Sequence, residues 1–293
     1  MKQLLILSGK GGTGKTTVAS AFIKLSAAKA YADCDVDAPN LHLVVDRQGE
    51  PETRPFYGMD KAWIDPEKCT GCGLCARECV FSAIERDEAT GMYQVDPFHC
   101  EGCALCEALC PVQGVQMVED QTGDLKLYIQ DKVFSTAQLK TGSGNSGLLV
   151  SEVKKQMDQS ARTELALIDG SPGIGCPVIA SISGVDLVLL VAEPSLSGLK
   201  DLERVIKTGQ IFGVKMVLCV NRYDENLDKT EAIESFARTQ GVEILGRIPY
   251  DPLVIKAINT GHNIAQMPGP AQEALQTIAG QLQKRMGSLK DLL

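Results

Sequence analysis

Eight of the eleven cysteines fall into two runs with the same internal spacing, C-x2-C-x2-C-x3-C. Thiolates at this spacing are typical of proteins that bind two 4Fe-4S clusters, in which the fourth cysteine of each run ligates the other cluster. Zinc sites of four cysteines tend instead to use two separated C-x2-C pairs. The sequence therefore predicts two 4Fe-4S clusters, one on each of two sets: Cys69, Cys72, Cys75 and Cys110, then Cys100, Cys103, Cys106 and Cys79.

The two runs belong to an internal repeat. Its copies begin at Ile64 and Val95 and align at an offset of 31 residues. Val80 follows the first run where Pro111 follows the second, so the turn after one cluster differs from the turn after the other. The spacing resembles that of bacterial two-cluster ferredoxins. We predict an inserted α+β, ferredoxin-like domain within a discontinuous larger domain: 61–120 inserted, 1–60 and 121–293 surrounding it.

A second chemical motif lies near the start of the chain. Residues 9–16 read GKGGTGKT and fit G-x-x-x-x-G-K-[ST], between an apolar strand and a helical pattern. In such a loop backbone N–H groups converge on phosphate oxygens, and the helix N-terminus adds a partial positive charge. We expect Lys15 to reach the β- and γ-phosphates, Thr16 to ligate Mg²⁺ and Thr17 to contact the α-phosphate. The backbone cradle is expected at Gly11, Gly12, Thr13 and Gly14.

The loop also contains an earlier lysine, Lys10, which the general P-loop pattern does not require. With it, the loop resembles the deviant Walker A motif of the MinD/ParA/Mrp (SIMIBI) superfamily of P-loop ATPases. The resemblance implies that Lys10 crosses a dimer interface to the partner's nucleotide, like an arginine finger supplied in trans. It therefore implies Mg²⁺-dependent ATP hydrolysis to ADP in a homodimer, or in a heterodimer with a paralogous ATPase.

The same resemblance assigns acidic residues. The segment YADCDVDAPNL resembles the family's switch I, and Asp35 takes the place of the carboxylate that polarises the attacking water. Asp33 and Asp37 flank it and are weaker candidates. Asp169 ends an apolar strand, as a Walker B aspartate does, and is expected to hold Mg²⁺. The glycine-rich segment 170–175 would then be switch II.

Two later segments match the parts of that family that hold the adenine. Asn221 ends the apolar run VLCVN and takes the place of the adenine-reading asparagine. The segment GRIPYDP, which contains Pro249, matches the loop that packs along the base. Together with the P-loop and the switch segments, they extend the resemblance over nearly all of the larger domain.

Apolar strands alternate with helical patterns outside the cysteine segment, and several strands are apolar along most of their length. Such strands are typical of a parallel sheet covered on both faces. We predict an α/β fold with a doubly wound, mostly parallel sheet. Strands are expected near 4–8, 165–169, 186–192, 216–221 and 242–248, and helices after residue 14 and near 148–159, 199–211, 229–240 and 272–286.

Composition restricts the possible partners and the compartment. The 293 residues carry a formal net charge of −8, which disfavours nucleic acid as a main partner. No apolar run approaches the roughly 20 residues needed to span a bilayer, and no export leader is visible. Clustered cysteines without such a leader favour metal sites over disulfides. We expect a cytoplasmic protein, with an apolar stripe near the C-terminus that packs in the core rather than on a membrane.

Three cysteines lie outside the two runs. Cys34 and Cys219 lie at the ends of apolar strands and are expected to pack in the core. Cys176 follows Asp169 by seven residues, the spacing of a cluster-ligating cysteine in the nitrogenase iron protein. A second cysteine is missing near Ser143, so a bridging cluster is disfavoured. Cys176 remains a candidate interface thiol for another metal or a partner.

Two function hypotheses follow. In the first, ATP-dependent dimerisation is coupled to electron transfer, or to metallocofactor assembly, on a redox or metallocofactor-carrying client. In the second, the chain is a positioning or partition ATPase whose clusters are structural or sense redox state. The first hypothesis is favoured. A partition protein is expected to show a basic patch or a membrane-binding tail, and neither is evident in the sequence.

Overall fold

The computed structural model describes residues 1–45 and 49–288. Within these ranges the main sheet has nine strands in the order β13-β12-β11-β1-β10-β2-β9-β8-β3. Neighbours from β13 to β9 are parallel, and β8 and β3 add two antiparallel strands at one edge. The predicted α/β fold with a mostly parallel sheet is confirmed. The strands are β1 (Lys2–Leu7), β2 (Ala30–Asp33), β3 (Glu52–Tyr57), β8 (Gln121–Ile129), β9 (Val133–Leu139), β10 (Leu165–Asp169), β11 (Leu187–Ala192), β12 (Lys215–Asn221) and β13 (Glu243–Ile248).

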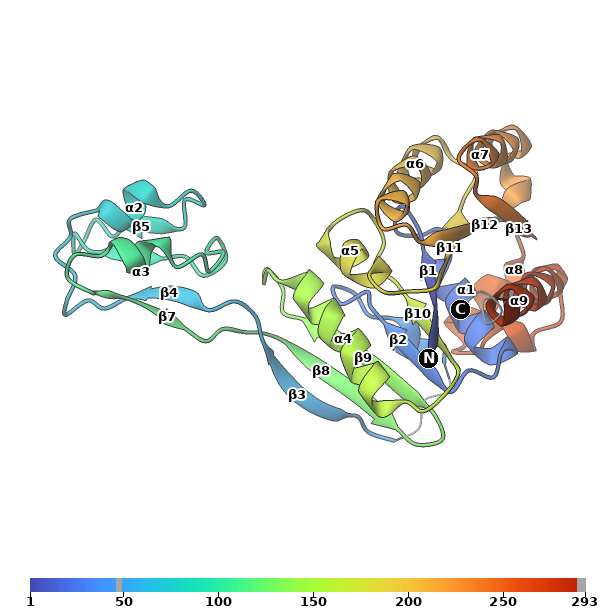
Figure 1. Cartoon of the computed structure of the whole chain (residues 1–293), viewed down its shortest axis with the longest axis horizontal. Coiled ribbons are helices and arrows are strands. Elements are labelled where there is room, and N and C mark those ends of the chain that lie inside the picture. Colours follow the sequence, from blue (N-terminus) through green and yellow to red (C-terminus); the bar gives the residue numbers. More distant parts are fainter. Residues whose placement is uncertain (46–48, 289–293) are drawn as a thin grey trace.

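Helices cover both faces of this sheet (Figure 1). In β1, Leu5 and Leu7 pack into one hydrophobic cluster while Leu4 and Ile6 pack into the other, as side-chain alternation requires. This explains why the central strand is apolar throughout. The helices are α1 (Lys15–Leu25), α4 (Ser146–Ser160), α5 (Cys176–Ile182), α6 (Leu196–Ile211), α7 (Leu227–Thr239), α8 (Pro252–Asn259) and α9 (Pro270–Ser288), with 3-10 turns at Leu41–Leu43, Tyr223–Glu225 and Ile264–Gln266.

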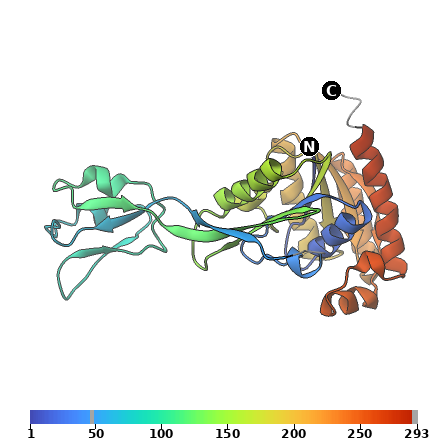
Figure 2. The ribbon, with the colours of Figure 1, turned by 90° about the horizontal axis from the view of Figure 1, so that it is seen from below.

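The last helix, α9, packs along the body of the molecule (Figure 2). Its apolar stripe, which comprises Leu275, Ile278, Leu282 and Met286, is buried in the cluster that also contains Phe22 of α1. The stripe is therefore part of the core, as predicted. None of the helices within the described ranges combines the length and apolar character needed to cross a bilayer.

The cysteine segment stands away from the sheet at the end of a two-stranded stalk (Figure 1). Strands β3 and β8 pair antiparallel, and the chain continues beyond them into the antiparallel pair β4 (Lys61–Ile64) and β7 (Val115–Val118). Residues 58–60 and 119–120 connect the two pairs. We call residues 61–118 the insert. It also contains α2 (Leu74–Glu78), α3 (Leu105–Leu109) and the hairpin of β5 (Ile84–Arg86) with β6 (Tyr93–Val95).

The insert has a small hydrophobic core of its own. Six buried residues form it: Ala62, Ile64, Ala83, Ile84, Cys100 and Val115. Cysteine side chains pack around these residues. With so few buried apolar groups, a segment of this size ordinarily needs a metal or another cross-link to be stable.

Candidate functional site

The loop between β1 and α1 has the backbone of a phosphate-binding loop. Gly12 and Gly14 adopt φ values of 82° and 90°, a left-handed region that favours glycine. Gly9 has no room for a side chain, since a Cβ there would lie 2.5 Å from Cβ of Asp201. Gly11 is exposed. The loop leads into the N-terminus of α1, where free N–H groups and the helix dipole favour an anion.

Lys15 and Asp169 form a buried ion pair at the base of this loop. Lys15 Nζ lies 2.6 Å from Asp169 Oδ1, and the side chains are 6% and 0% exposed. Burial alone would lower the pKa of Lys15, but the nearby carboxylates of Asp169, Asp33 and Asp35 outweigh it and raise the pKa. Among the described residues, neither Asp169 Oδ2 nor Thr13 Oγ1, both buried, has a hydrogen-bond partner. A buried carboxylate oxygen without a partner, on the aspartate that pairs with Lys15, suits an oxygen-ligated cation.

The three aspartates of the predicted switch I segment have different surroundings. Asp33, at the end of β2, accepts hydrogen bonds from the backbone N–H groups of Asp35, Asn40 and Leu41, each at 3.0 Å. Burial and the charge of Asp169 raise the pKa of Asp33 to about 7. Burial also raises the pKa of Asp35, although the ammonium of Lys15 opposes this. Asp37 is exposed. Asp33 thus organises the loop, and Asp35 is half-buried within range of Lys15.

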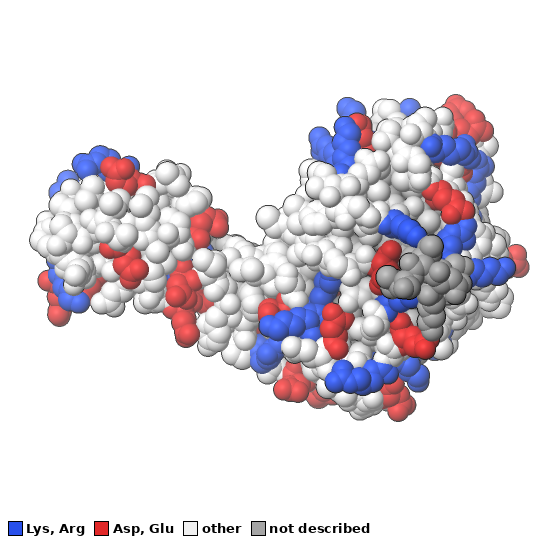
Figure 3. Space-filling view, viewed as in Figure 1, with Lys and Arg blue, Asp and Glu red and all other residues white. Residues whose placement is uncertain are grey.

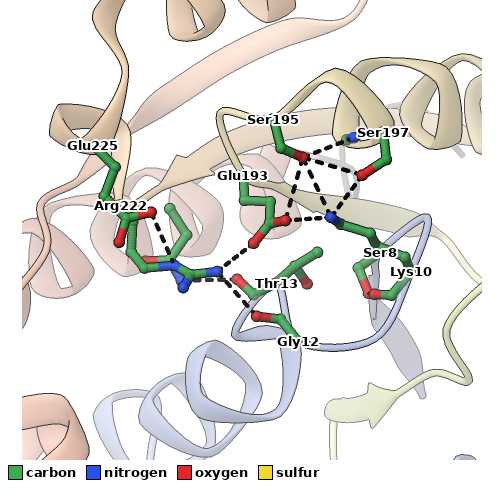
Figure 4. Close-up of polar contacts among 11 residues, drawn as sticks. Ser8, Lys10, Gly12, Thr13, Glu193, Ser195, Ser197, Arg222 and Glu225 are labelled. Carbon is green, nitrogen blue, oxygen red and sulfur yellow. Dashed lines mark hydrogen bonds and ion pairs between the residues drawn. The ribbon is translucent and has the colours of Figure 1, made fainter.

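Lys10 is held by its own chain in this structure (Figure 4). Its ammonium pairs with the carboxylate of Glu193 and donates to Ser195 Oγ at 3.3 Å and Ser197 Oγ at 2.8 Å. Glu193 also pairs with Arg222, which donates to the Gly12 carbonyl at 3.1 Å. One carboxylate therefore neutralises two cations beside the P-loop.

Sequence reasoning missed both Glu193 and Arg222. Each directly follows the last residue of a parallel strand: Glu193 follows β11, and Arg222 follows β12. Ligands of such sheets bind outside the carboxyl ends of the strands. The position of these residues after the apolar runs VLLVA and VLCVN was the signal that could have found them.

A cavity of about 180 Å³ adjoins the P-loop on the side of β12 and α8. Asn221 donates from Nδ2 to the Thr13 carbonyl at 2.8 Å, so it is tied to the loop. The predicted base-binding residues Asn221 and Pro249 line this cavity with P-loop residues, as do Tyr250 and Asp251 of the same predicted segment GRIPYDP. The lining comprises Gly12, Gly14, Thr17, Val18, Asn221, Arg222, Ile248, Pro249, Tyr250, Asp251, Val254, Ile255, Ile258, Ala271 and Leu275.

Two further cavities lie in the insert, and thiols line both. The thiols of the first are those of the first predicted ligand set: Cys69, Cys72, Cys75 and Cys110. The second cavity contains the other set together with Cys75: Cys79, Cys100, Cys103 and Cys106. Each cavity thus takes its fourth cysteine from the opposite run.

The backbone around these cavities is also suited to wrap a ligand. Gly71, Gly73 and Gly102 have φ values near 70°, and Gly73 packs against the Tyr93 hydroxyl, 2.6 Å from where a Cβ would lie. Backbone N–H groups donate to cysteine sulfur, as from Gly114 to Cys110 Sγ at 3.2 Å. All eight cysteines of the insert are free thiols. In the described part of the chain, no group of three or more His, Cys, Asp or Glu side chains converges closely enough to hold a single metal ion.

The remaining cysteines differ from one another. Cys34 and Cys219 are fully buried, and burial raises the pKa of each thiol to about 12. They pack in the core, as predicted. Cys176 is exposed at the first residue of α5. A Cβ at Gly147, in the first turn of α4, would lie 3.1 Å from Cβ of Cys176, so the N-termini of the two helices are in close contact.

The insert touches the loop that precedes α4. A Cβ at Gly142 would lie 2.9 Å from Cδ1 of Phe98, and one at Gly144 would lie 3.7 Å from Oε2 of Glu101. Phe98 and Glu101 flank Cys100. The glycine- and serine-rich segment 139–147 is therefore in contact with the second cysteine run.

Helix α4 contacts both the N-terminal and the C-terminal end of α5. Besides the contact of Gly147 with Cys176, the ammonium of Lys154 donates to the carbonyls of Ala180, Ser181 and Ser183 at 2.5–3.2 Å. These carbonyls lie at the C-terminal end of α5, where a cation is favourable. A continuous set of contacts thus joins the loop after Asp169 to the second cysteine run.

Comparison with known proteins agrees with this geometry. Residues 4–264 match the model of the CobQ/CobB/MinD/ParA nucleotide binding domain. An uncharacterized protein of Methanocaldococcus jannaschii is 31% identical over 227 residues, 76% of this chain and 79% of its own length. The septum site-determining protein MinD of Bacillus subtilis is 25% identical over 276 residues, 90% of this chain and 82% of its own.

The fold is also found among solved structures. MinD of Pyrococcus horikoshii, determined with Mg-ADP, superposes with a TM-score of 0.56 at 19% identity, covering 98% of this chain and 97% of its own. At this identity the likeness concerns the fold alone. The family match spans most of the sequence. The chain belongs to the CobQ/CobB/MinD/ParA family of nucleotide-binding proteins.

Proposed function

We propose that this chain is a Mg²⁺-dependent, ATP-hydrolysing iron–sulfur protein. In it, nucleotide-dependent dimerisation is coupled to electron transfer, or to metallocofactor assembly, on a client protein. The observation that carries the proposal is the pair of thiol-lined cavities, each with its fourth cysteine from the opposite run. Four thiols around a cavity suit a 4Fe-4S cluster, whose ligands bind different iron atoms. Ligands of a single zinc ion would have to meet about 2.3 Å from one point.

At the nucleotide site, Lys15 would contact the β- and γ-phosphates once ATP draws it from Asp169. Thr16 and Asp169 would ligate Mg²⁺, and the unpartnered Oδ2 of Asp169 supports that role. Asp35 would orient the attacking water, and Asn221 and Pro249 would hold the base in the adjoining cavity. A bound metal ion neutralises charge on the transferred phosphoryl group.

Lys10 would change partners during the cycle. In the single chain it is neutralised by Glu193. In the closed dimer it would leave Glu193 for the phosphates held by the other subunit, as the family resemblance implies. Dimerisation then requires ATP to bind the closed state more tightly than the open one.

The contacts between the two regions give the coupling a physical basis. ATP acts on the loop after Asp169, α5 follows that loop, and Lys154 fixes α5 to α4. The loop before α4 touches Phe98 and Glu101 beside Cys100. Movement of the switch on nucleotide binding would therefore reach the second cluster. Apolar side chains exposed near both cavities offer a client a surface: Val80, Phe81, Leu105, Leu109 and Val112.

The test is anaerobic. The clusters are reconstituted in the full chain, and their EPR signals and reduction potentials are recorded without nucleotide, with ADP and with a non-hydrolysable ATP analogue. We expect the potential of at least one cluster to change with the ATP analogue. Substitution Lys10→Ala should abolish that change together with ATP-dependent dimerisation and most ATP turnover. Lys29→Ala, an exposed lysine beyond α1, is the matched control.

A second candidate function is favoured by one observation. Bacillus subtilis MinD, named as a septum site-determining protein, matches 90% of this chain, and a MinC:MinD complex is among the solved structures with this fold. The chain would then be a positioning ATPase with structural or redox-sensing clusters. Potentials that do not depend on nucleotide, together with normal ATP-dependent dimerisation, would favour this function over the first. Turnover and dimerisation that both survive Lys10→Ala would refute the role assigned to Lys10.

A further inference from the structure

Lys61 is a buried lysine that the nucleotide site does not use. It is the first residue of β4 and is only 5% exposed. Its ammonium donates to the carbonyl oxygen of Cys100, which is its one polar partner among the residues that the structure describes. An ammonium in such surroundings is costly unless a negative charge lies nearby.

The ammonium of Lys61 binds the backbone of a residue that lines the second thiol-lined cavity. Cys100 lines that cavity with Cys79, Cys103 and Cys106, and Ala62, next to Lys61, lines it too. When thiolates hold an iron–sulfur cluster, the assembly carries a net negative charge, and this charge is one determinant of its reduction potential. The cluster in this cavity would thus supply a counter-charge, which no ion pair of Lys61 supplies within the described part of the chain.

The first cavity has no such cation. The repeat offset of 31 residues places Met92 where the other copy has Lys61. Within the described residues, the lining of the first cavity contains no Lys, Arg, Asp or Glu. Two sites that are alike in their thiols therefore differ in one buried positive charge.

Acidic groups near the second cavity carry negative charge, which opposes the effect of the Lys61 ammonium on a bound cluster. Glu78 and Glu101 line the cavity, but both residues are exposed. Charges in contact with water are screened, whereas a buried charge acts through a lower effective dielectric constant. The ammonium of Lys61 therefore has the larger influence on the cavity.

We propose that Lys61 is a positioning residue that holds the second cluster at a higher reduction potential than the first, by stabilising the added electron. This inference rests on the proposed function, since it presupposes a cluster in each cavity. In the singly reduced chain the electron would reside on the second cluster. That cluster lies beside Phe98 and Glu101, which contact the loop before α4.

The experiment uses the full chain, reconstituted anaerobically and titrated with reductant while both clusters are followed by EPR. Substitution Lys61→Met gives the second site the residue of the first. We expect the higher of the two potentials to fall and the lower to stay, so that the two titration steps approach each other. Lys61→Arg keeps the charge and should keep the separation. Lys68→Met, at a half-exposed lysine beside Cys69, should move neither potential.

The iron content of the wild-type chain and of the variants distinguishes failure of the proposed function from failure of the role assigned to Lys61. Wild-type chain that never binds two clusters would contradict the proposed function itself. If Lys61→Met retains full iron and both potentials are unchanged, the role of Lys61 is refuted and the proposed function stands. If Lys61→Met loses iron and Lys61→Arg restores it, a requirement for the charge is supported. If Lys61→Arg also loses iron, the requirement for a positive charge at this position is refuted.

Discussion

At the P-loop, charged side chains neutralise one another within the chain, whereas in the insert eight thiols surround two cavities beside a single buried cation. Lys15 pairs with Asp169, and Glu193 holds both Lys10 and Arg222. The nucleotide end is thus balanced before any ligand binds. The insert has six buried core residues, and cysteines are prominent among the partly buried side chains that pack against them.

In Figure 3, acidic and basic side chains lie scattered among uncharged ones over both the insert and the body, so surface charge on this face does not distinguish the two regions. The comparison suggests that the body folds by its own packing and binds nucleotide by exchanging internal ion pairs. The insert is expected to take its stability from what it binds. Three predictions test this difference, beginning with the largest effect.

If the insert binds iron–sulfur clusters as proposed, removal of the iron should loosen the insert and leave the rest of the chain unchanged. We expect an anaerobic chelator to speed amide hydrogen exchange in residues 61–118 by about 100-fold or more, because metal binding free energy becomes folding free energy in a small domain. Exchange in β1, β10 and β11 should change little, and ATP binding should survive. Mass spectrometry of peptides from both regions measures this. An insert equally protected without iron would contradict the comparison.

Loss of the carboxylate that neutralises the P-loop cations should strengthen nucleotide binding. In Glu193→Gln, Lys10 and Arg222 lose their shared anion, so the potential at the phosphate site becomes more positive. We expect ADP to bind about 3- to 10-fold more tightly at low salt, with the gain shrinking as salt increases. Calorimetric titration checks this. Glu225→Gln, a more exposed carboxylate 3.9 Å from Arg222 Nε, should have little effect.

The smallest effect concerns an ion pair that belongs to the body alone. Glu234 in α7 is 5% exposed and accepts from Arg247 of β13 at 2.6 and 3.1 Å. Hydrogen bonds from Arg247 lower the pKa of Glu234. We expect Glu234→Gln to lower the free energy of unfolding by about 1–3 kcal/mol at pH 7.

The pH dependence of this effect follows from the sign of the shift. A carboxyl whose pKa is lowered by folding stabilises the protein above its ordinary pKa and loses this contribution as pH falls through the folded value. The difference between Glu234→Gln and wild type should therefore shrink below about pH 4.5. Denaturant titrations at several pH values, with the exposed Glu231→Gln as control, measure it. A pH-independent difference would rule out the ion pair as its source.

Much of the fold could be predicted from hydrophobic patterns. The strands expected at 165–169 and 186–192 correspond to β10 and β11, and the helices expected at 148–159 and 229–240 differ from α4 and α7 by two residues or fewer at each end. Buried parallel strands and amphipathic helices leave strong local patterns. The four residues of β2 and the mixed polar and apolar strands β3, β8 and β9 leave weak ones. The antiparallel edge of the sheet was therefore missed.

The sequence by itself determined which residues the chain offers for chemistry. The spacing of eight cysteines and the glycines and lysines of residues 9–16 specify ligand types, because local backbone geometry fixes what such short motifs can surround. Only the tertiary structure decided how their charges are balanced. Glu193 reaches Lys10, Lys61 reaches Cys100, and Phe98 reaches Gly142 because neighbouring strands and a long stalk bring distant residues together. Such contacts depend on packing between elements, which no local pattern encodes.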